Sequence, residues 1–231
     1  MQSIKPMEMK YQFWGAEGVC FSDVTDVSLP AGVRLVMPQQ THTTNVGVVT
    51  SPDEQFPETD ALITQTPGLA VGVRTADCVP VLLYAPDIRA VAAIHAGWKG
   101  TVGMIVAKTI DKLVEMGARP KIMKAAYGPS ICGECYETGT DLAEKFIEAG
   151  LGEAVKRGRA LDPLGEKIFD GSSVRIDLQQ ANTIIMCRRG IPEANITTCT
   201  ECTRHAPGGY WPSWRRNPGT ASRLATVIFL R

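Results

Sequence analysis

Short apolar runs separated by turn-forming residues dominate the first hundred positions of the chain. The runs are rich in Val, Ile, Leu and Ala, and Pro, Gly, Asp or Asn stands between them. This pattern is typical of β-strands. It predicts strands at residues 33–37, 46–49, 61–64, 69–73, 79–84 and 90–94, and a further buried strand at 224–230.

The apolar period changes after Gly100. Six apolar residues then recur at the i, i+3 and i+4 spacing of an amphipathic helix that Gly117 would end. They are Val102, Ile105, Val106, Ile110, Leu113 and Val114. A strand follows at 122–127, and two more helices are predicted behind the capping pairs Asp141 with Glu144 and Asp177 with Gln180.

The order of these elements favours the α+β class. Strands outnumber helices and mostly follow one another directly, unlike the alternation of a doubly wound parallel sheet. No repeat or long linker interrupts the chain, so we expect residues 1–231 to form a single domain. If the strands flanking Pro86-Asp87 pair as a hairpin, Cys78 and His95 lie at the same end of a sheet.

Composition narrows the class of ligand. The chain has 231 residues, of which 44% are hydrophobic, and its 24 Lys and Arg balance 24 Asp and Glu. A formal net charge of zero removes the usual electrostatic motive for binding nucleic acid or an anionic membrane. The first ten residues have no apolar signal region, and no segment is apolar over the roughly 18 residues of a membrane span. We expect a cytoplasmic protein with a small-molecule ligand.

Three residues form a candidate catalytic metal site. The chain contains only three histidines, and two of them, His42 and His95, stand with Cys78 beside apolar runs. One thiolate and two imidazoles suit Zn²⁺, and a fourth position left open is typical of catalytic zinc. The simpler alternatives are a loop histidine at position 42 and a buried core thiol at position 78.

The remaining cysteines suggest a second hypothesis. An odd count of seven, without a signal region, argues against a disulfide framework. Cys132-x-x-Cys135 and Cys199-x-x-Cys202 have the spacing of zinc ligands and would supply four sulfurs if the fold brought them together. Cys20 and Cys187 are predicted to be small core residues. His205 lies in a Gly- and Pro-containing loop and is assigned no role.

Several motifs along nearly the whole chain resemble the laccase-domain, YfiH-like family. They are Gln40-Thr-His42, Thr59-Asp-Ala-Leu-Ile-Thr64, Thr75-Ala-Asp-Cys-Val-Pro80, Ile94-His-Ala-Gly-Trp98, Gly128-Pro-Ser-Ile131 and Cys135-Tyr-Glu137. The resemblance implies a single zinc site at His42, Cys78 and His95. It also implies an α+β domain with two central mixed β-layers between outer helices.

The resemblance further implies purine nucleoside chemistry. The expected reaction is phosphorolysis of adenosine, inosine, guanosine and methylthioadenosine to the base and a sugar 1-phosphate, with adenosine deamination as a second activity. Copper polyphenol oxidase chemistry, which the family name suggests, is disfavoured because three histidines cannot populate a multicopper cluster. Zinc is therefore the expected metal rather than copper.

Other polar and aromatic residues complete the predicted site. Asp77 is a candidate proton shuttle or a partner that orients a histidine. Arg74, Arg215 and Arg216 are candidates for holding phosphate, since guanidinium groups bind its oxygens in bidentate geometry. Trp98 and Tyr136 are candidates for stacking on a purine. The family's Ser-x-Arg-Arg-Asp and Thr-Gly-Arg patterns are altered here, with Asn217 and Ala221-Ser222-Arg223 in their place.

Two functions of other classes remain open on the sequence. The resemblance also implies an alternative, a zinc- or cysteine-dependent amidase that edits a peptidoglycan precursor, in which Cys78 with His42 or His95 would serve as nucleophile and base. A non-catalytic interaction module that keeps a structural metal is the third hypothesis. The oligomeric state and the preferred nucleoside are not predicted.

Overall fold

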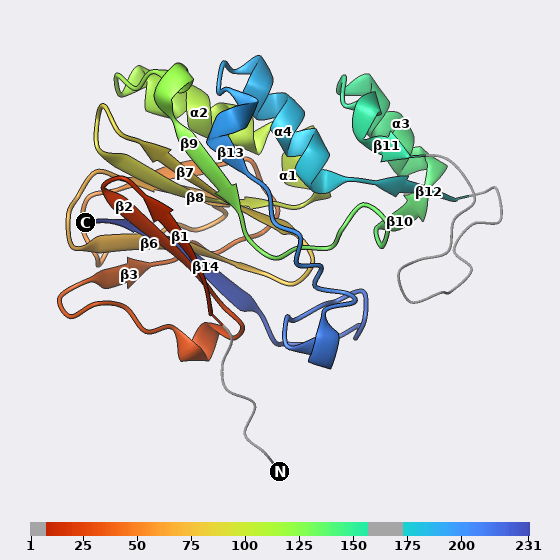
Figure 1. Ribbon diagram of the computed structural model, residues 1–231, viewed down its shortest axis with the longest axis horizontal. Helices are drawn as coiled ribbons and strands as arrows, with labels where there is room; N and C mark the ends of the chain where they lie inside the picture. Colours follow the sequence, from red (N-terminus) through yellow and green to blue (C-terminus); the bar gives the residue numbers. More distant parts are fainter. Residues whose placement is uncertain (1–7, 157–172) are drawn as a thin grey trace, which may run out of the picture.

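Two stacked β-sheets form the centre of the molecule, and α-helices lie over one of them (Figure 1). The computed structural model describes residues 8–156 and 173–231. Among these described residues, no helix has the length and apolar character needed to cross a membrane. The predicted α+β class and the two central β-layers are confirmed.

The six-stranded sheet contains most of the predicted strands. Its strand order is β13-β9-β7-β8-β5-β4. In that order the strands are Ile196–Thr197, Lys124–Tyr127, Val79–Ala85, Ala90–Ala96, Ala61–Thr64 and Val46–Val49. The two edge strands, β13 and β4, run parallel to their neighbours, and the inner pairs are antiparallel. The layer is therefore mixed, as expected.

The five-stranded sheet has the order β1-β2-β14-β6-β3. Its strands are Glu8–Phe13, Ala16–Phe21, Leu224–Leu230, Leu69–Thr75 and Arg34–Val36. The C-terminal strand β14 agrees with its prediction and occupies the middle of this sheet. The hairpin β1–β2 was not predicted, because β1 is a short edge strand whose three apolar residues alternate with polar ones instead of forming an apolar run.

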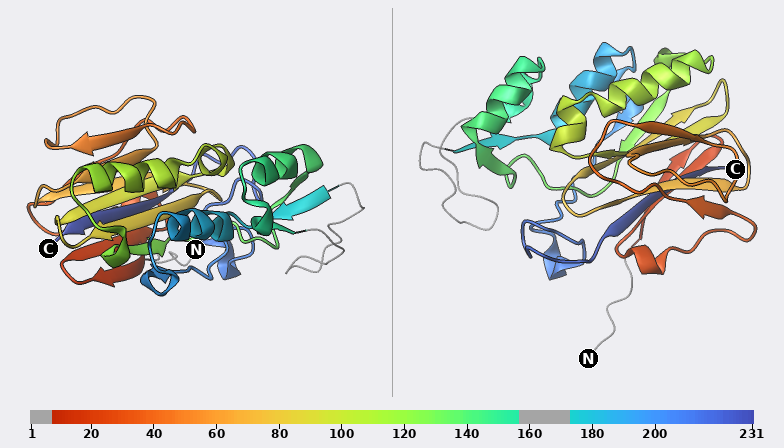
Figure 2. Two further views of the ribbon diagram at one scale, coloured as in Figure 1. Left: turned by 90° about the horizontal axis from the view of Figure 1, so that it is seen from above. Right: turned by 180° about the vertical axis from the view of Figure 1, so that it is seen from behind.

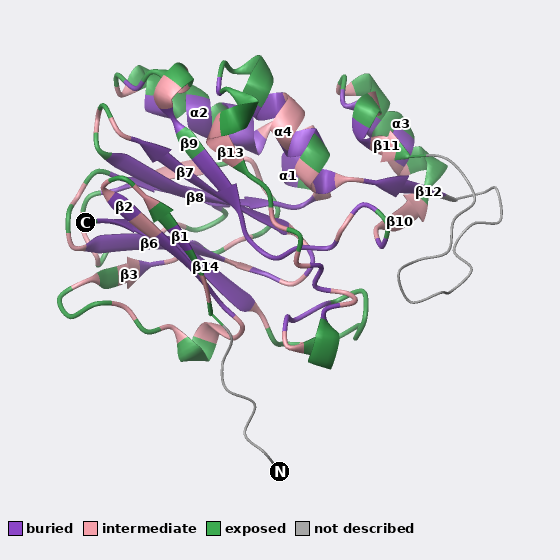
Figure 3. Ribbon diagram, viewed as in Figure 1, coloured by how far each residue is buried: buried purple, intermediate pink, exposed green. Residues whose placement is uncertain are grey.

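The main core lies on both faces of the six-stranded sheet. Toward the other sheet, Leu62, Leu82 and Val91 pack with Val71 and Ile228. Every residue of β7 and β8 is buried, because both faces of these strands are covered (Figure 3). This double burial explains why these strands are continuous apolar runs without polar alternation.

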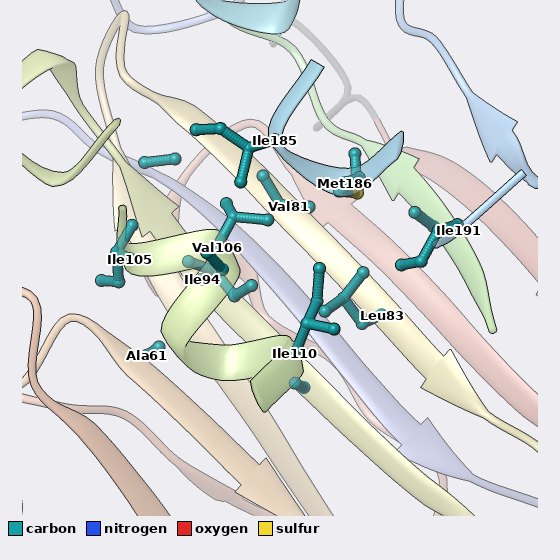
Figure 4. Packing of buried hydrophobic residues seen from close by; sticks show 14 of the residues in the cluster. Ala61, Val81, Leu83, Ile94, Ile105, Val106, Ile110, Ile185, Met186 and Ile191 are labelled. Atoms are coloured by element: carbon teal, nitrogen blue, oxygen red, sulfur yellow. The ribbon is translucent and has the colours of Figure 1, made fainter. Parts of the chain in front are cut away.

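Helices cover the outer face of the six-stranded sheet (Figure 2). They are α1 (Trp98–Val102), α2 (Ile105–Glu115) and α4 (Leu178–Arg188). Figure 4 shows Ile105, Val106 and Ile110 of α2 packed over Leu83 and Ile94 of the sheet. The five-stranded sheet is covered differently: a 3-10 turn, η1 (Val24–Asp26), and the loop after it pack on its outer face.

The predicted amphipathic helix is divided in two. Met104 adopts a left-handed conformation, with a φ of 64°, and separates α1 from α2. Such a conformation cannot continue an α-helix. The sequence pattern does not reveal the break, because Val102 and Ile105 keep the helical spacing across it.

A smaller sheet and α3 (Thr140–Glu148) lie to one side of the main layers (Figure 1). The sheet has the order β10-β12-β11, with strands Glu137–Gly139, Ser173–Ile176 and Val155–Lys156. The helix was predicted, but its predicted cap was wrong. Gly139 occupies the N-cap without a side-chain hydrogen bond, and Asp141 lies within the first turn.

The hairpin of β7 and β8 positions the candidate site. Pro80 pairs with His95 and Ala85 pairs with Ala90 across the two strands. Cys78 immediately precedes β7, and His95 lies near the end of β8. The prediction that these two residues lie at the same end of a sheet is confirmed.

The first prediction concerns the cap of α4. The Asp177 carboxylate accepts a hydrogen bond of 3.0 Å from the Gln180 amide, as the sequence predicted. Asp177→Ala should lower the free energy of unfolding by about 1 kcal/mol, the usual value of an N-cap. Chemical denaturation measures the loss. Asp141→Ala is the control, because Asp141 accepts no cap bond and should cost less than about 0.5 kcal/mol; equal losses would contradict the capping assignment.

Candidate metal centre and cavity

His42, Cys78 and His95 converge at the end of the six-stranded sheet. Their potential ligand atoms all lie within 4.8 Å of one another. The two imidazole rings are 4.8 Å apart between centroids and meet edge to face at 69°. His95 is buried, Cys78 is half-buried and His42 is exposed. The fold thus brings together three residues that the sequence separates by 53 positions.

The buried carboxylate of Asp60 holds two of these residues in place. Asp60 directly precedes β5, and its Oδ1 lies 2.7 Å from Nδ1 of His95. The same carboxylate accepts backbone hydrogen bonds from Thr41, His42 and Thr43, at 3.2, 3.1 and 2.7 Å. A single side chain therefore orients the ring of His95 and shapes the loop that presents His42, whose φ is 62°.

Hydrogen bonding keeps Asp60 ionised. Burial alone would raise its pKa, but the hydrogen bonds from His95 and from the Thr43 backbone outweigh burial and lower the pKa to about 2. A carboxylate that accepts from Nδ1 of His95 leaves Nε2 to face the site. This is the usual arrangement around histidines that ligate zinc.

The thiol and the imidazole also shift each other's ionisation. Burial would raise the pKa of Cys78, but the charge of His95 and the hydrogen bond with His42 lower it to about 6. Burial would lower the pKa of His95, but the charge of Cys78 and the hydrogen bond to Asp60 raise it to about 9. Near neutral pH the metal-free site therefore favours the thiolate, which is the form that binds metals.

Gly97 leaves the space that a metal would need. A Cβ atom at position 97 would lie 2.8 Å from Sγ of Cys78 and 3.3 Å from Cδ2 of His42. Any side chain there would crowd both candidate ligands. The sulfur and nitrogen donors, the close spacing and this cleared approach fit a zinc ion held by three protein ligands.

A cavity of about 660 Å³ opens over the three residues. Its volume lies in the usual range for small-molecule sites. Trp98, Tyr136 and Trp214 contribute aromatic walls. Three arginines also line the cavity: Arg74, Arg215 and Arg223.

Asp77 lines the cavity but uses both carboxylate oxygens on the C-terminal segment. Oδ1 accepts from the Thr203 hydroxyl and Oδ2 from the Arg215 backbone amide, each at 2.6 Å. The residue has a φ of 88°, which turns the chain sharply just before Cys78. Through these two hydrogen bonds, Asp77 holds residues 203 and 215 at the end of the sheet, so it is a positioning residue.

Two of the predicted phosphate residues reach the cavity. Arg74 donates a 2.8 Å hydrogen bond to the Pro38 carbonyl, and Gln40 bonds both backbone groups of Arg74. Arg215 donates to the Glu137 carbonyl at 2.8 Å and lies 5.3 Å from the centre of the Tyr136 ring. Each guanidinium has five N–H donors, so these bonds do not exhaust it.

The structure does not bring Arg216 to the cavity. Its guanidinium donates to four backbone carbonyls of the C-terminal loop, those of Thr203, Arg204, Gly209 and Trp211. It therefore organises this loop. Arg223, which the sequence interpretation left without a role, lines the cavity instead. It stands just before β14, in the altered Ala221-Ser222-Arg223 segment.

The predicted four-sulfur cluster does not form as such. Sγ of Cys199 lies 3.9 Å from Sδ of Met9, and Cys199 is not among the residues that gather around Cys132, Cys135 and Cys202. Cys20 is buried, as predicted, but the prediction of a core position for Cys187 was wrong. Cys187 lies in the last turn of α4 and is exposed.

Sequence reasoning missed Asp60, Gly97 and Arg223 as parts of the site. Asp60 and Gly97 stand within quoted motifs, but an acidic residue or a glycine beside an apolar strand is ordinarily read as turn chemistry. Only their contacts with His95 and Cys78 identify what they do. Arg223 depends on the pairing of β14 with β6, which no local pattern predicts.

The fold and site define a class of α+β proteins in which one cysteine and two histidines meet at the end of a β-hairpin. The chain belongs to the family described as multi-copper polyphenol oxidoreductase laccase, whose model matches residues 24–231. The crystal structure of Bacillus licheniformis hypothetical protein YfiH resembles it with a TM-score of 0.76 and 28% identity, over 85% of this chain and 74% of that one.

Curated relatives carry two kinds of name. A purine nucleoside phosphorylase of Deinococcus radiodurans is 40% identical over 187 residues, which cover 80% of this chain and 66% of that protein. An adenosine deaminase, RL5, of an unknown prokaryotic organism is 38% identical over 209 residues, covering 84% of this chain and 74% of that protein. The chain thus spans only 66% of the length of the first relative and 74% of the second.

The second prediction tests the buried carboxylate. Asp60→Asn should lower the free energy of unfolding of the zinc-free protein by about 3 kcal/mol at neutral pH, because a buried charged partner of His95 is removed. The pKa of Asp60 is lowered to about 2, so this stabilisation is present above its ordinary pKa of about 3.9. It is lost as the pH falls from about 4 toward 2.

Denaturant titrations of wild type and variant across this pH range measure the difference. Asp53→Asn is the matched control, since Asp53 forms an exposed pair with Arg34 and should change stability by less than about 1 kcal/mol. A constant difference between wild type and Asp60→Asn down to pH 2 would contradict the proposed ionisation.

The third prediction concerns the thiolate. In the zinc-free protein, alkylation of Cys78 by iodoacetamide should rise with pH and reach half its maximum near the pKa of about 6. Peptide mass spectrometry follows each cysteine separately. Exposed Cys187 is the internal control, because desolvation and Glu193 raise its pKa above the ordinary value. Equal midpoints for the two thiols would show that His95 does not act on Cys78.

Proposed function

We propose that the protein is a zinc-dependent purine nucleoside phosphorylase that acts on adenosine, inosine, guanosine and methylthioadenosine. Adenosine deamination is proposed as a second activity of the same site. One observation carries this proposal: a single cavity combines the Cys78, His42 and His95 set with aromatic walls and three arginines. The names of the relatives from Deinococcus radiodurans and the unknown prokaryote support it.

The aromatic residues suit the base. A purine offers two flat faces, and Tyr136, Trp98 and Trp214 supply rings along the cavity. Stacking on such rings is strong and tolerates several bases. This tolerance agrees with a proposed substrate range that includes both amino- and oxo-purines.

The arginines suit the phosphate. Arg74 and Arg223 stand on adjacent strands or their ends, since Arg74 pairs with Ala225 across β6 and β14. Arg215 faces the same cavity from the C-terminal segment. Guanidinium groups bind phosphate oxygens in bidentate geometry, so this set would hold the nucleophile beside the ribose.

In phosphorolysis, a phosphate oxygen forms a bond to C1′ as the bond from C1′ to N9 breaks. The electron pair leaves with the base, which takes up a proton, and ribose 1-phosphate remains. The arginines would orient the phosphate, and the aromatic walls would hold the base at an attacking distance. Asp77 would act by positioning Arg215, to whose backbone it is bonded.

His42, Cys78 and His95 would hold the zinc ion. When bound, the ion supplies a Lewis acid that makes water more acidic, as hydrolytic loss of ammonia from purine C6 requires. Asp60 would keep the His95 ring in register with the other two ligands. Gly97 would keep the approach to Cys78 open.

The small number of histidines disfavours copper oxidase chemistry. The chain contains three histidines, and His205 lies in a separate cluster with three cysteines. Only His42 and His95 remain for the cavity, whereas a multicopper centre uses many imidazoles. The family description therefore does not specify the activity that we propose.

A peptidoglycan-precursor amidase is the second candidate. The observation that favours it is the lowered pKa of Cys78 beside two histidines, which is also the signature of a nucleophilic cysteine. The cationic and aromatic lining favours a nucleoside and phosphate over this substrate.

The fourth prediction is the activity itself. Purified protein incubated with adenosine and inorganic phosphate should release adenine and ribose 1-phosphate, which chromatography separates from inosine. Omitting phosphate should abolish adenine release and leave any inosine formation intact. Cys78→Ala should lower both activities at least about 100-fold, because it removes a metal ligand.

Cys187→Ala is the matched control, because it removes an exposed thiol outside the cavity and should keep full activity. Full activity of Cys78→Ala would contradict the site assignment. No product from folded, zinc-loaded wild type would contradict the phosphorylase proposal and make the peptidoglycan precursor the next substrate.

A further inference from the structure

A second cluster of potential metal ligands lies beside the cavity. It consists of Cys132, Cys135, Cys202 and His205, whose ligand atoms all lie within 4.8 Å of one another. The first two stand between β9 and β10, and the other two between β13 and β14. Cys135 and Cys202 are buried, and the other two are half-buried. The purine chemistry proposed above makes no use of this cluster.

Backbone pairing holds the two segments together. Ser130 and Cys202 form an isolated parallel β-bridge. The Ser130 amide donates to the Glu201 carbonyl at 3.3 Å, and the Thr203 amide donates to the Ser130 carbonyl at 3.0 Å. Residues about 70 positions apart are thus placed side by side by main-chain bonds that do not depend on the side chains of the cluster.

Each of the two segments forms a tight turn that places its two candidate ligands close together. The Cys135 amide donates to the Cys132 carbonyl at 3.0 Å, and the Ala206 amide donates to the Cys202 carbonyl at 2.9 Å. The resulting pattern is Cys-x-x-Cys followed by Cys-x-x-His. Pairs of ligands with two residues between them are typical of structural zinc sites.

The distances agree with tetrahedral coordination. A Zn–S bond of about 2.3 Å in a tetrahedron places neighbouring donors about 3.8 Å apart. Sγ of Cys135 lies 3.3 Å from Nδ1 of His205, close to this spacing, and the other pairs of ligand atoms lie within 4.8 Å. The Cys132 backbone amide also donates to Sγ of Cys202 at 3.3 Å. An amide that donates to a sulfur favours the thiolate, which is the ligand form.

A disulfide explains the cluster less well. Three thiols cannot all pair within it, and all seven cysteines of the chain are free thiols. A disulfide would also leave the convergence of His205 on Cys135 unexplained. Three sulfurs and one imidazole nitrogen complete a four-ligand set without any open position, which is the arrangement of a structural site.

We propose that Cys132, Cys135, Cys202 and His205 bind a structural zinc ion that is separate from the site at His42, Cys78 and His95. The set replaces the four-sulfur hypothesis, with His205 in the place of Cys199. The ion joins the segment after β9 to the segment before β14, two stretches that secondary structure links only by an isolated bridge.

This zinc would stabilise one wall of the cavity. Tyr136 follows Cys135 and lines the cavity. Thr203 follows Cys202 and donates to Asp77, and its carbonyl accepts from Arg216. The cluster therefore anchors both the aromatic residue and the loop that leads to Arg215. The metal site itself does not depend on the reaction proposed for the cavity.

The fifth prediction concerns the zinc content per chain of four purified proteins, measured by inductively coupled plasma mass spectrometry. Wild type should hold two zinc ions per chain, and Cys135→Ser and Cys78→Ser should each hold one. Cys199→Ser is the matched control, since Cys199 belongs to a Cys-x-x-Cys pair but not to the cluster, and it should keep two. Wild-type zinc content in a folded Cys135→Ser protein would overturn the proposal.

A cobalt experiment identifies the ligands independently of activity. Cys78→Ser reconstituted with Co²⁺ should show the strong sulfur-to-cobalt absorption of a site with three thiolates, and Cys78→Ser/His205→Ala should show it weakened or shifted. If Cys135→Ser fails to fold, His205→Cys is the alternative variant; it keeps four ligands, all of them sulfurs, and should retain the metal with a stronger sulfur-to-cobalt absorption. One zinc per wild-type chain that Cys135→Ser retains and Cys78→Ser loses, or a disulfide among Cys132, Cys135 and Cys202 in the freshly purified protein, would also overturn the proposal.

Discussion

The carboxylate of Asp60 is the constraint on which the candidate site depends. It is fully buried, and a buried carboxylate is costly unless its oxygens are satisfied by donors. The donors are the ring of His95 and the backbone of the loop that carries His42. The hydrogen bonds that stabilise the buried charge of Asp60 are therefore the same ones that place His42 and His95 in the site. The loop needs no secondary structure of its own, because three of its amides are bound to one side chain.

The sheet supplies the rigidity that a loop site lacks. All residues of β7 and β8 are buried between helices on one face and the second sheet on the other, so the ends of these strands cannot shift independently. His95 pairs with Pro80 across the hairpin and Cys78 immediately precedes β7, so both residues share this rigidity. These elements were predictable because a strand buried on both faces is a plain apolar run, and Pro86-Asp87 marks its turn. The same logic predicted β5 and β14.

Features that depend on distant pairing could not be predicted. The edge strand β1 is short and alternates only three apolar residues with polar ones, and the break at Met104 leaves the helical spacing intact. The sequence interpretation assigned phosphate binding to Arg216 and no role to Arg223. Only the loop carbonyls around Arg216, and the position of Arg223 at the start of β14, separate a structural arginine from one that faces the cavity. His205 had no predicted role, because Cys135, its neighbour in space, is 70 positions away in the sequence.

The cavity wall opposite the sheet is built from contacts rather than from regular structure. Asp77 receives the Thr203 hydroxyl and the Arg215 amide, and Arg216 gathers four carbonyls of the same segment. Trp211 and Ala206 of this segment are buried in the core between the two sheets, and these polar contacts hold the rest of the segment in place. A tetrahedral ion at Cys132, Cys135, Cys202 and His205 would tie this segment to the segment after β9. On this argument the two proposed metal sites would have different roles: the ion at Cys78 would face the ligand, and the ion at Cys202 would keep the wall in place.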